Sequence, residues 1–283
     1  MKVGFNLLLW TSHVTEQHFQ LLPRLKNAGY DGVEIPILEG TPGYYGKMLP
    51  VLKDAGLKAV VATNMPGVEC NPVSAKKAER DKSLDFMKLV IDCTQALESD
   101  LLVGPWYQPV GLFTGAGPTD EEKGRAAEHA KASARHAAKA GITLAVEFLN
   151  RFEAYVLTTM DGIAEHVRAV AEPNYKAMFD TFHANIEEAD PVASILAHRK
   201  IITHVHVSEN NRGVPGRGHN NWPGIFKALR STGYDGWLTV EAFGRFLPAF
   251  AAATKIWRDM YESPEALYTE AAGFIRRQWE AAA

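Results

Sequence analysis

AVEFLNRFE at residues 145–153 is the first of four short segments in the second half of the chain that decide its fold. AMFDTFH at 177–183, THVHVSENNR at 203–212 and WLTVEAF at 237–243 follow it. Each is an apolar run, typical of a β-strand, that ends in an acidic or imidazole side chain. One such ending is common. Four in succession, separated by helix-like stretches, predict that their end residues converge on one point: Glu147, Asp180, His206 and Glu241.

The whole chain repeats the pattern of a strand followed by a helix. Short β-rich runs lie near residues 2–9, 31–37, 57–62, 100–106, 142–148, 175–181, 201–207 and 236–242. Longer amphipathic stretches include 17–28, 76–97, 121–140 and 222–232. Strands that alternate with helices indicate parallel pairing through right-handed crossovers. The count of eight, and candidate ligands from four consecutive units, favour closure into a barrel over an open, doubly wound sheet.

We therefore predict one α/β domain over residues 1–283, a single-domain (β/α)8 TIM barrel, because no proline- or serine-rich linker divides the chain. The segment after Ser263 predicts an extra C-terminal helix at about 264–282. Its apolar face consists of Leu267, Ala271, Phe274, Ile275 and Trp279. We expect this helix to cap the bottom of the barrel or to pack in a subunit contact.

The bulk composition argues against several classes of protein. A formal net charge of -3 disfavours nucleic acid as the main partner, because phosphate binding normally requires a basic face. No apolar run approaches the ~20 residues of a membrane-spanning helix. The N-terminal MKVGFNLLLW reads as a strand and not as a signal peptide. Cys70 and Cys93 have no ligand-like spacing and fit reduced thiols. We expect a soluble, cytoplasmic protein that acts on a small molecule.

The four candidate ligands define a chemistry. Three carboxylates and one imidazole favour Mn²⁺ or Mg²⁺, with Co²⁺ as a substitute, over a thiolate-type zinc site, although ligand types alone do not exclude zinc. Such an ion can stabilise the enediolate that forms when a ketose loses the proton next to its carbonyl. Glu147 and Glu241 are the candidates for taking and returning that proton. Return to the opposite face gives an epimer, and return to the neighbouring carbon gives an aldose. The residues alone do not choose between these outcomes.

Each candidate also has a plainer structural interpretation. A glutamate at a strand end is often a salt-bridged loop residue, and Asp180 could cap the turn that follows it. His204 has the same facing as His206 in a strand, so it is a competing ligand that should lie deeper in the barrel. Glu34 fits a buried hydrogen-bonding role. The coincidence of all four strand ends is what favours a site.

Longer strings within these segments are specific enough to resemble a known family. LNRFE, FDTFHANIEE, HVHVSENNRGVPGRG and VEAF together resemble the D-tagatose 3-epimerase family of ketose 3-epimerases. That family includes allulose (psicose) and L-ribulose 3-epimerases and belongs to the xylose isomerase-like TIM barrels. The resemblance runs over the whole chain and is densest from 145 to 243. It implies a metal-dependent ketose 3-epimerase that interconverts C3 epimers of free ketohexoses and ketopentoses through a metal-bound cis-enediolate.

The resemblance also implies roles for particular residues. It places the metal ligands, with Mn²⁺ as the usual ion, at Glu147, Asp180, His206 and Glu241. It assigns proton transfer to Glu147 and Glu241, and substrate contacts at the reacting end to Glu153, His183 and Arg212. The implied pairs of substrates are D-tagatose and D-sorbose, D-fructose and D-allulose, and L-ribulose and L-xylulose. A homodimer or homotetramer is implied as well.

Substrate preference is less well defined by the sequence. Ser208 stands where many family members have glycine, and Ala242 follows Glu241 where proline or serine is frequent. The far part of the pocket should come from loops after the first four strands, with these candidates: Trp10, His13, Asn64, Met65, Trp106 and Tyr107. Trp106 reads equally well as a sugar-stacking wall and as plain core.

Alternative functions remain open on the same barrel. The first is hydroxypyruvate or inosose isomerisation, inosose dehydration, or epimerisation of a sugar phosphate, for which the glycine-rich stretch 213–218 could supply backbone amides. The second is a DNA-repair endonuclease of the endonuclease IV type, which the acidic balance and the single-metal ligand set disfavour. The third is a sugar-binding protein without turnover, which would not need the glutamate pair.

Overall fold

Eight parallel strands pair in chain order and close into a barrel because β1 pairs with β8. The computed structural model describes residues 1–283. The strands are β1 (Lys2–Asn6), β2 (Gly32–Pro36), β3 (Lys58–Ala62), β4 (Leu101–Gly104), β5 (Thr143–Val146), β6 (Tyr175–Asp180), β7 (Ile202–Val207) and β8 (Trp237–Val240). Each lies inside a predicted run, so the eight-stranded barrel is confirmed. The first strand is shorter than expected because the Asn6 side chain accepts a hydrogen bond from Leu8 N and starts a 3₁₀ turn.

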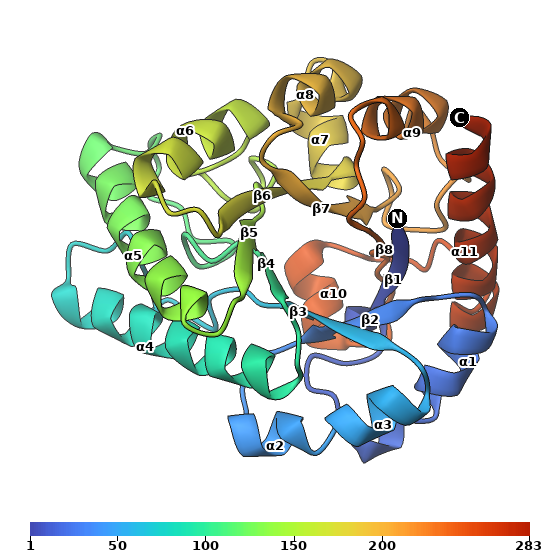
Figure 1. Ribbon diagram of the computed structural model, residues 1–283. Coiled ribbons are helices and arrows are strands. Elements are labelled where there is room, and N and C mark those ends of the chain that lie inside the picture. Colours follow the sequence, from blue (N-terminus) through green and yellow to red (C-terminus); the bar gives the residue numbers. More distant parts are fainter.

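Helices surround the barrel in a ring, apart from the short helix Pro248–Thr254, which lies inside the ring in this view (Figure 1). They are α1 (Leu21–Asn27), α2 (Pro42–Gly46), α3 (Leu49–Asp54), α4 (Lys77–Ala96), α5 (Asp120–Ala138), α6 (Met160–Val170), α7 (Thr181–Glu187), α8 (Pro191–His198), α9 (Trp222–Ser231), α10 (Pro248–Thr254) and α11 (Pro264–Ala281). The predicted helices at 76–97, 121–140 and 222–232 agree with α4, α5 and α9. The stretch 17–28 is a 3₁₀ turn, Glu16–His18, followed by α1. No helix is long and apolar enough to cross a membrane.

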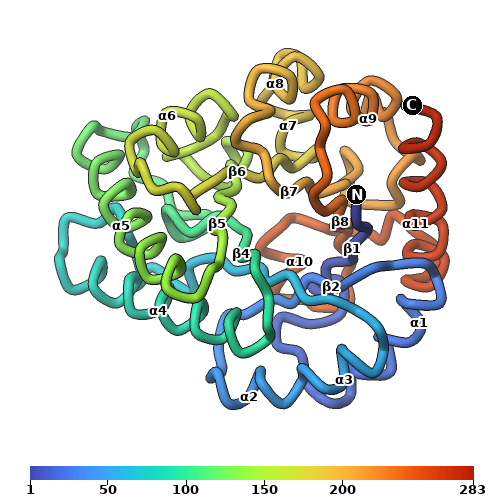
Figure 2. Tube along the Cα trace, viewed as in Figure 1, coloured from blue at the N-terminus to red at the C-terminus, as the bar shows by residue number.

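The C-terminal helix α11 lies in the outer ring, between α9 and α1 (Figure 2). The expectation that it caps the bottom of the barrel was wrong, because it packs along the sides of β8 and β1. Leu267, Ala271 and Ile275 on its apolar face are fully buried within the chain. The Tyr30 hydroxyl donates a hydrogen bond to Tyr268 O and joins this helix to the first βα unit. Three residues of the apolar face are therefore buried within the chain, while Phe274 and Trp279 are only partly buried.

The lower part of the barrel interior is filled by an apolar cluster, which consists of Val60, Ala62, Leu101, Val103, Ala145, Met178 and Trp237. Trp237 is the first residue of β8, and its ring lies beside β1 and β2. Gly32 makes room for it, because a Cβ at that position would lie 2.5 Å from Trp237 Cη2. The apolar cluster is a packed floor, as expected in a barrel of this size.

At the carboxyl ends of the strands, polar side chains replace apolar ones in the barrel interior. The strand register places Asn6 beside Glu34 and Asp180 beside His206. All four side chains are buried. Parallel pairing thus collects residues distant in sequence into one layer above the apolar cluster.

Candidate active site

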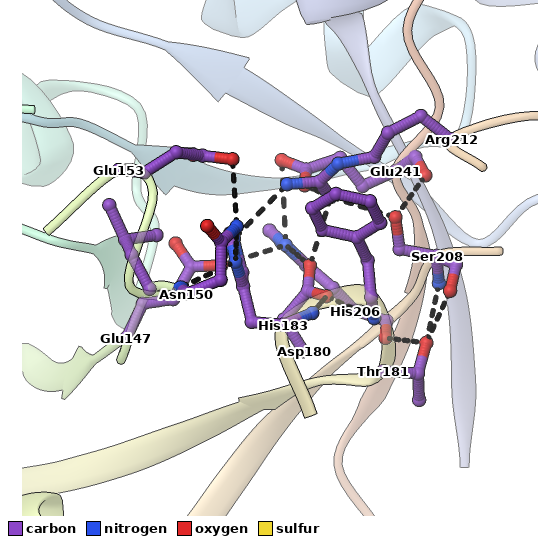
Figure 3. Close-up of polar contacts among 12 residues, drawn as sticks. Glu147, Asn150, Glu153, Asp180, Thr181, His183, His206, Ser208, Arg212 and Glu241 are labelled. Carbon is purple, nitrogen blue, oxygen red and sulfur yellow. Dashed lines mark hydrogen bonds and ion pairs between the residues drawn. The ribbon is translucent and has the colours of Figure 1, made fainter. Parts of the chain in front are cut away.

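The four predicted ligand residues meet at one point in this polar layer (Figure 3). Glu147 follows β5, Asp180 ends β6, His206 lies in β7 and Glu241 follows β8. One ligand atom from each lies within 4.8 Å of every other, and all four residues are buried. His206 Nδ1 is 3.4 Å from Asp180 Oδ2, 3.5 Å from Glu241 Oε1 and 3.7 Å from Glu147 Oε1. That nitrogen has no hydrogen-bond partner, as a free ligand atom would have none.

Asp180 serves two purposes at once. Its Oδ1 accepts hydrogen bonds from Phe182 N (2.6 Å) and His183 N (3.1 Å), which makes it the cap of α7. Its Oδ2 faces His206 and Arg212. The plainer interpretation as a helix cap is confirmed for Oδ1, and Oδ2 stays available as a candidate ligand. The cap also fixes the direction in which the second oxygen points.

A second polar group lies beneath these ligands and holds His206 in place. Glu34 Oε1 is 2.9 Å from His206 Nε2, and Glu34 Oε2 is 3.0 Å from His204 Nε2. Asn6 Nδ2 donates to Glu34 Oε1 (2.7 Å) and to Glu241 Oε1 (3.0 Å). The competing ligand His204 therefore lies deeper, as expected, and contacts Glu34. A carboxylate at Nε2 leaves Nδ1 of His206 free to bind a cation, the usual arrangement behind a metal-binding histidine.

Arg212 crosses the top of the cluster. Its Nη1 donates to Glu241 Oε2 (2.5 Å) and lies 3.3 Å from Asp180 Oδ2. Its Nη2 is 3.1 Å from His183 Nε2. The guanidinium carbon lies 3.8 Å from the centre of the Phe182 ring. One arginine thus contacts two of the carboxylates and the predicted substrate-binding histidine while an aromatic ring supports its plane.

Asn150, which the sequence did not single out, joins the remaining predicted contacts. Its backbone N donates to His183 Nδ1 (3.0 Å), and its Nδ2 donates to Glu153 Oε1 (2.9 Å). His183 Nε2 in turn lies 3.8 Å from Glu147 Oε1. Figure 3 shows these side chains on the side of the cluster opposite Glu241. The only hint in the sequence was the position of Asn150 inside LNRFE.

Burial and neighbouring charges divide the carboxylates into two kinds. Burial raises the pKa of Glu147 well above its usual range, and the negative charges of Glu241 and Asp180 add to this effect. Burial also opposes ionisation of Asp180, but Arg212 and the nearby histidines outweigh it and lower its pKa. Burial would lower the pKa of His206, but the surrounding carboxylates, Glu34 first, raise it well above its usual range. Without a cation, the cluster therefore keeps protons on Glu147 and His206.

The cluster opens into a cavity with an empty volume of about 640 Å³. Glu147, Glu153, His183, Arg212 and Glu241 all line it. The rest of the wall is mainly apolar and includes Leu8, Leu38, Val110, Leu149, Phe243 and Phe250. Thr254 and Phe250 come from α10, which no sequence pattern predicted.

Of the candidates for the far wall, only Asn64 lines the cavity. Trp106 does not: its side chain is fully buried in the main hydrophobic core. Of the two interpretations of Trp106, a sugar-stacking wall and plain core, its position agrees with plain core. The reason is that a large indole gains more from complete burial between barrel and helices than from one exposed face. Trp10, His13, Met65 and Tyr107 likewise lie away from the cavity wall.

In the glycine-rich stretch 213–218, the amides of Gly213, Gly216 and Arg217 donate to Asn211 Oδ1, Glu209 Oε2 and Val214 O within the chain. The carboxylate of Glu209, which is fully buried, accepts hydrogen bonds from Gly216 N (2.7 Å), Asn210 N (3.0 Å) and Trp222 Nε1 (2.8 Å). None of residues 213–218 lines the cavity. The Glu209 carboxylate thus accepts the kind of backbone N–H hydrogen bond that a bound anion accepts in other loops.

The fold and the site together define a class: β/α barrels whose strand ends carry a carboxylate-rich candidate cation site. The chain belongs to the xylose isomerase-like TIM barrel family, whose sequence profile matches residues 22–278. Within that family its relatives are ketose 3-epimerases, so it is an isomerase. A D-psicose 3-epimerase from Agrobacterium fabrum is 30% identical, with 92% of this chain and 91% of that protein covered.

Solved structures agree with the sequence comparison. A structure of L-ribulose 3-epimerase is similar with a TM-score of 0.94 at 28% identity, covering 99% of this chain and 95% of that one. A D-allulose 3-epimerase from Methylomonas sp. in complex with D-allulose has a TM-score of 0.92 at 25% identity, covering 98% and 97%. The similarity extends over the whole barrel and is not limited to the segments around the site.

Proposed function

We propose that this protein is a metal-dependent 3-epimerase of free ketohexoses and ketopentoses. The observation that carries the proposal is the meeting of Glu147 and Glu241, from β5 and β8, around His206 in the wall of one cavity. Two carboxylates that approach a substrate from different strands can act on the two faces of one carbon. Binding alone would not require such a pair.

The donor set fits a divalent cation. It offers three carboxylate oxygens and one imidazole nitrogen within 4.8 Å of one another, and His206 Nδ1 is buried without a hydrogen-bond partner. Oxygen-rich sets of this kind suit Mn²⁺, Mg²⁺ or Co²⁺. The ion would be held by Glu147, Asp180, His206 and Glu241. When bound, it would polarise the ketose carbonyl and acidify the neighbouring C–H group. We take Mn²⁺ as the ion, following the family resemblance.

The protein's own residues would move the proton. Burial raises the pKa of Glu147, as is common for catalytic carboxylates that exchange protons with a substrate. One glutamate removes the proton from C3, and the other delivers a proton to the opposite face, which inverts that carbon. Arg212 and His183 lie where they can hold the oxygens of the reacting end. Glu153, fixed by Asn150, can accept a hydrogen bond from a sugar hydroxyl.

Free sugars are favoured over sugar phosphates for a specific reason. In the loop after β7, where many barrels bind phosphate, the amides of Asn210, Gly216 and Asn220 are bound by Glu209. A phosphate would have to displace a buried carboxylate that already has its hydrogen bonds. We therefore propose the free ketoses D-tagatose, D-fructose, D-allulose and L-ribulose as substrates. A cytoplasmic homodimer or homotetramer completes the proposal, supported by the resemblance alone.

The first experiment is a turnover screen of metal-stripped protein before and after addition of Mn²⁺. It compares those four sugars with xylulose 5-phosphate and ribulose 5-phosphate, with the products separated by chromatography. Mn²⁺-dependent C3 epimers of free ketoses would support the proposal, and the ranking of rates would name the preferred sugar. Turnover of the phosphates alone would contradict it. Inactivity on all six would direct attention to hydroxypyruvate and inosose isomerisation.

A further inference from the structure

Glu209 lies next to the proposed site but lines no part of the cavity. It follows Ser208 at the start of the loop between β7 and α9 and is fully buried. Its Oε1 accepts from Asn210 N (3.0 Å) and Asn220 N (3.4 Å). Its Oε2 accepts from Gly216 N (2.7 Å) and Trp222 Nε1 (2.8 Å). All of these donors belong to residues 210–222, so one carboxylate ties both ends of the loop together.

The same loop carries Arg212 in a conformation that needs support. Arg212 has φ +61°, the left-handed region that a residue with a side chain adopts only when its surroundings enforce it. Its backbone N donates to Glu209 O (2.9 Å), and its O accepts from Phe243 N (2.9 Å). In this conformation the side chain contacts Glu241, Asp180 and His183 together (Figure 3).

We infer that Glu209 is a positioning residue: its buried carboxylate folds the loop 209–222 into the shape that aims Arg212 at the proposed metal and substrate site. The inference rests on the proposed function. A carboxylate offers acceptors only, and it matches a ring of N–H donors in a way that a neutral amide cannot. Replacing one oxygen by NH₂ would bring an N–H donor face to face with the N–H donors that this oxygen now accepts from. Because Glu209 is fully buried, those donors would lose their hydrogen bonds.

A purely structural role for Glu209 predicts something different. If the carboxylate only stabilised the loop, its loss would lower the melting temperature and leave the activity of folded protein unchanged. If it acts through Arg212, its loss must reduce catalysis, and the reduction must disappear once Arg212 is already gone. These two outcomes separate the interpretations.

The experiment compares E209Q with the matched variant E270Q. Glu270 of α11 binds Arg217 of the same loop from outside, with Nη2 to Oε2 at 2.6 Å, and is partly exposed. E209Q should lower kcat/KM on the order of 10- to 100-fold, the cost of a displacement of about 1 Å at a reacting centre. E270Q, the same chemical change on the loop surface, should leave kcat/KM unchanged. Equal kcat/KM for E209Q and wild type would overturn the inference.

The double variant E209Q/R212A supplies the test of mechanism. Its kcat/KM should equal that of R212A to within about twofold, which is the usual precision of comparisons between single and double variants. A further loss on top of R212A would show that Glu209 acts on the site by another route and would overturn the inference. G218A disturbs the same carboxylate from the loop side, because a Cβ there would lie 2.5 Å from Glu209 Oε1. It should reproduce the loss of E209Q.

Hydrogen exchange tests the loop without any need for turnover. In E209Q the amides of 209–222 should exchange faster than in wild type, while those of α11 remain protected. Unchanged exchange over 209–222 would overturn the inference whatever the activity. An inactive wild type with faster loop exchange in E209Q would instead contradict the proposed function, so the two failures can be told apart.

Discussion

The two ends of the barrel interior are built on opposite principles. The apolar cluster around Trp237 has no charged member, and glycines at positions 4 and 32 leave room for its largest ring. The other end buries Glu34, Glu147, Asp180, His206 and Glu241, together with Arg212. The two ends lie close together, because His204, which pairs in register with Trp237, is only two residues before His206 in β7.

This difference shows which end holds the fold and which end performs the chemistry. Apolar packing stabilises the barrel through burial and close fit. Buried charges stabilise little, because the cost of removing them from water offsets their attraction. The charges at the carboxyl ends are therefore explained by what they do to a bound cation and sugar. Changes at the apolar end should alter stability, and changes at the charged end should alter binding and turnover.

The largest expected effect is loss of turnover in E241Q. The amide can still contact a cation through its oxygen but cannot exchange a proton, so turnover should fall at least ~10²-fold while some metal binding remains. Steady-state rates of the metal-replete variant, with bound Mn²⁺ measured in parallel, test this expectation. Near-normal turnover by metal-replete E241Q would contradict the two-glutamate mechanism.

The strongest effect at the other end should come from W237A. Removal of the fully packed indole leaves a cavity under the polar layer and should cost about 3–5 kcal/mol in the free energy of unfolding. Urea denaturation measures this cost. Turnover per folded molecule should stay close to that of wild type. A selective loss of turnover in stable W237A would remove the distinction between the two ends.

E34Q tests the layer between them. Glu34 orients His206 through Nε2, and an amide there weakens that hold, so Mn²⁺ affinity should fall about 10- to 100-fold. Calorimetric titration measures the affinity without any turnover. E39Q, the same change at an exposed glutamate near the barrel mouth, is the control and should bind Mn²⁺ like wild type. An E34Q protein with unchanged affinity would show that packing alone orients His206.

Metal affinity should also rise with pH. Glu147 and His206 both have raised pKa values in the absence of a cation, and both must lose a proton to become ligands. Binding therefore releases protons, and affinity should increase up to about tenfold per pH unit for each proton released. Titrations in two buffers of different ionisation enthalpy count the protons. Affinity that falls as pH rises would contradict the assigned protonation states.

The smallest effect is expected for M178L. Met178 is fully buried in the apolar cluster, and leucine has a similar volume, so the cost should stay below about 1.5 kcal/mol. Turnover and Mn²⁺ affinity should not change. The comparison with W237A would then show how strongly the stability that the apolar cluster provides depends on the side-chain volume that is removed. A marked loss of activity in M178L would show that the floor shapes the site.

The sequence predicted the barrel and the meeting of the four ligands because both follow from local patterns. Each strand is an apolar run, and each ligand stands at the end of one. The network beneath them was less accessible, since Glu34 and His206 are 172 positions apart and Asn6 and Glu241 are 235 apart. Contacts of that kind depend on the register of the closed barrel.

The remaining gaps have equally physical causes. The sequence leaves Trp106 open between a sugar wall and plain core, because the direction of a side chain after a strand depends on the turn that follows. Gly104 makes that turn with φ +133°, and a Cβ there would lie 2.0 Å from Thr63 O. The helix α11 was expected below the barrel because its amphipathic pattern shows that a face is buried but not against what.

The position of α11 has a consequence for synthesis on the ribosome. β1 finds its second neighbour only in β8, and the outer side of both is covered by α11. An emerging chain can build βα units one after another but cannot close the ring until almost all of it has left the exit tunnel. Until then β1 carries an unpaired edge of the kind that invites aggregation. Pairing of β1 with β8, under the cover of α11, therefore removes the exposed edge.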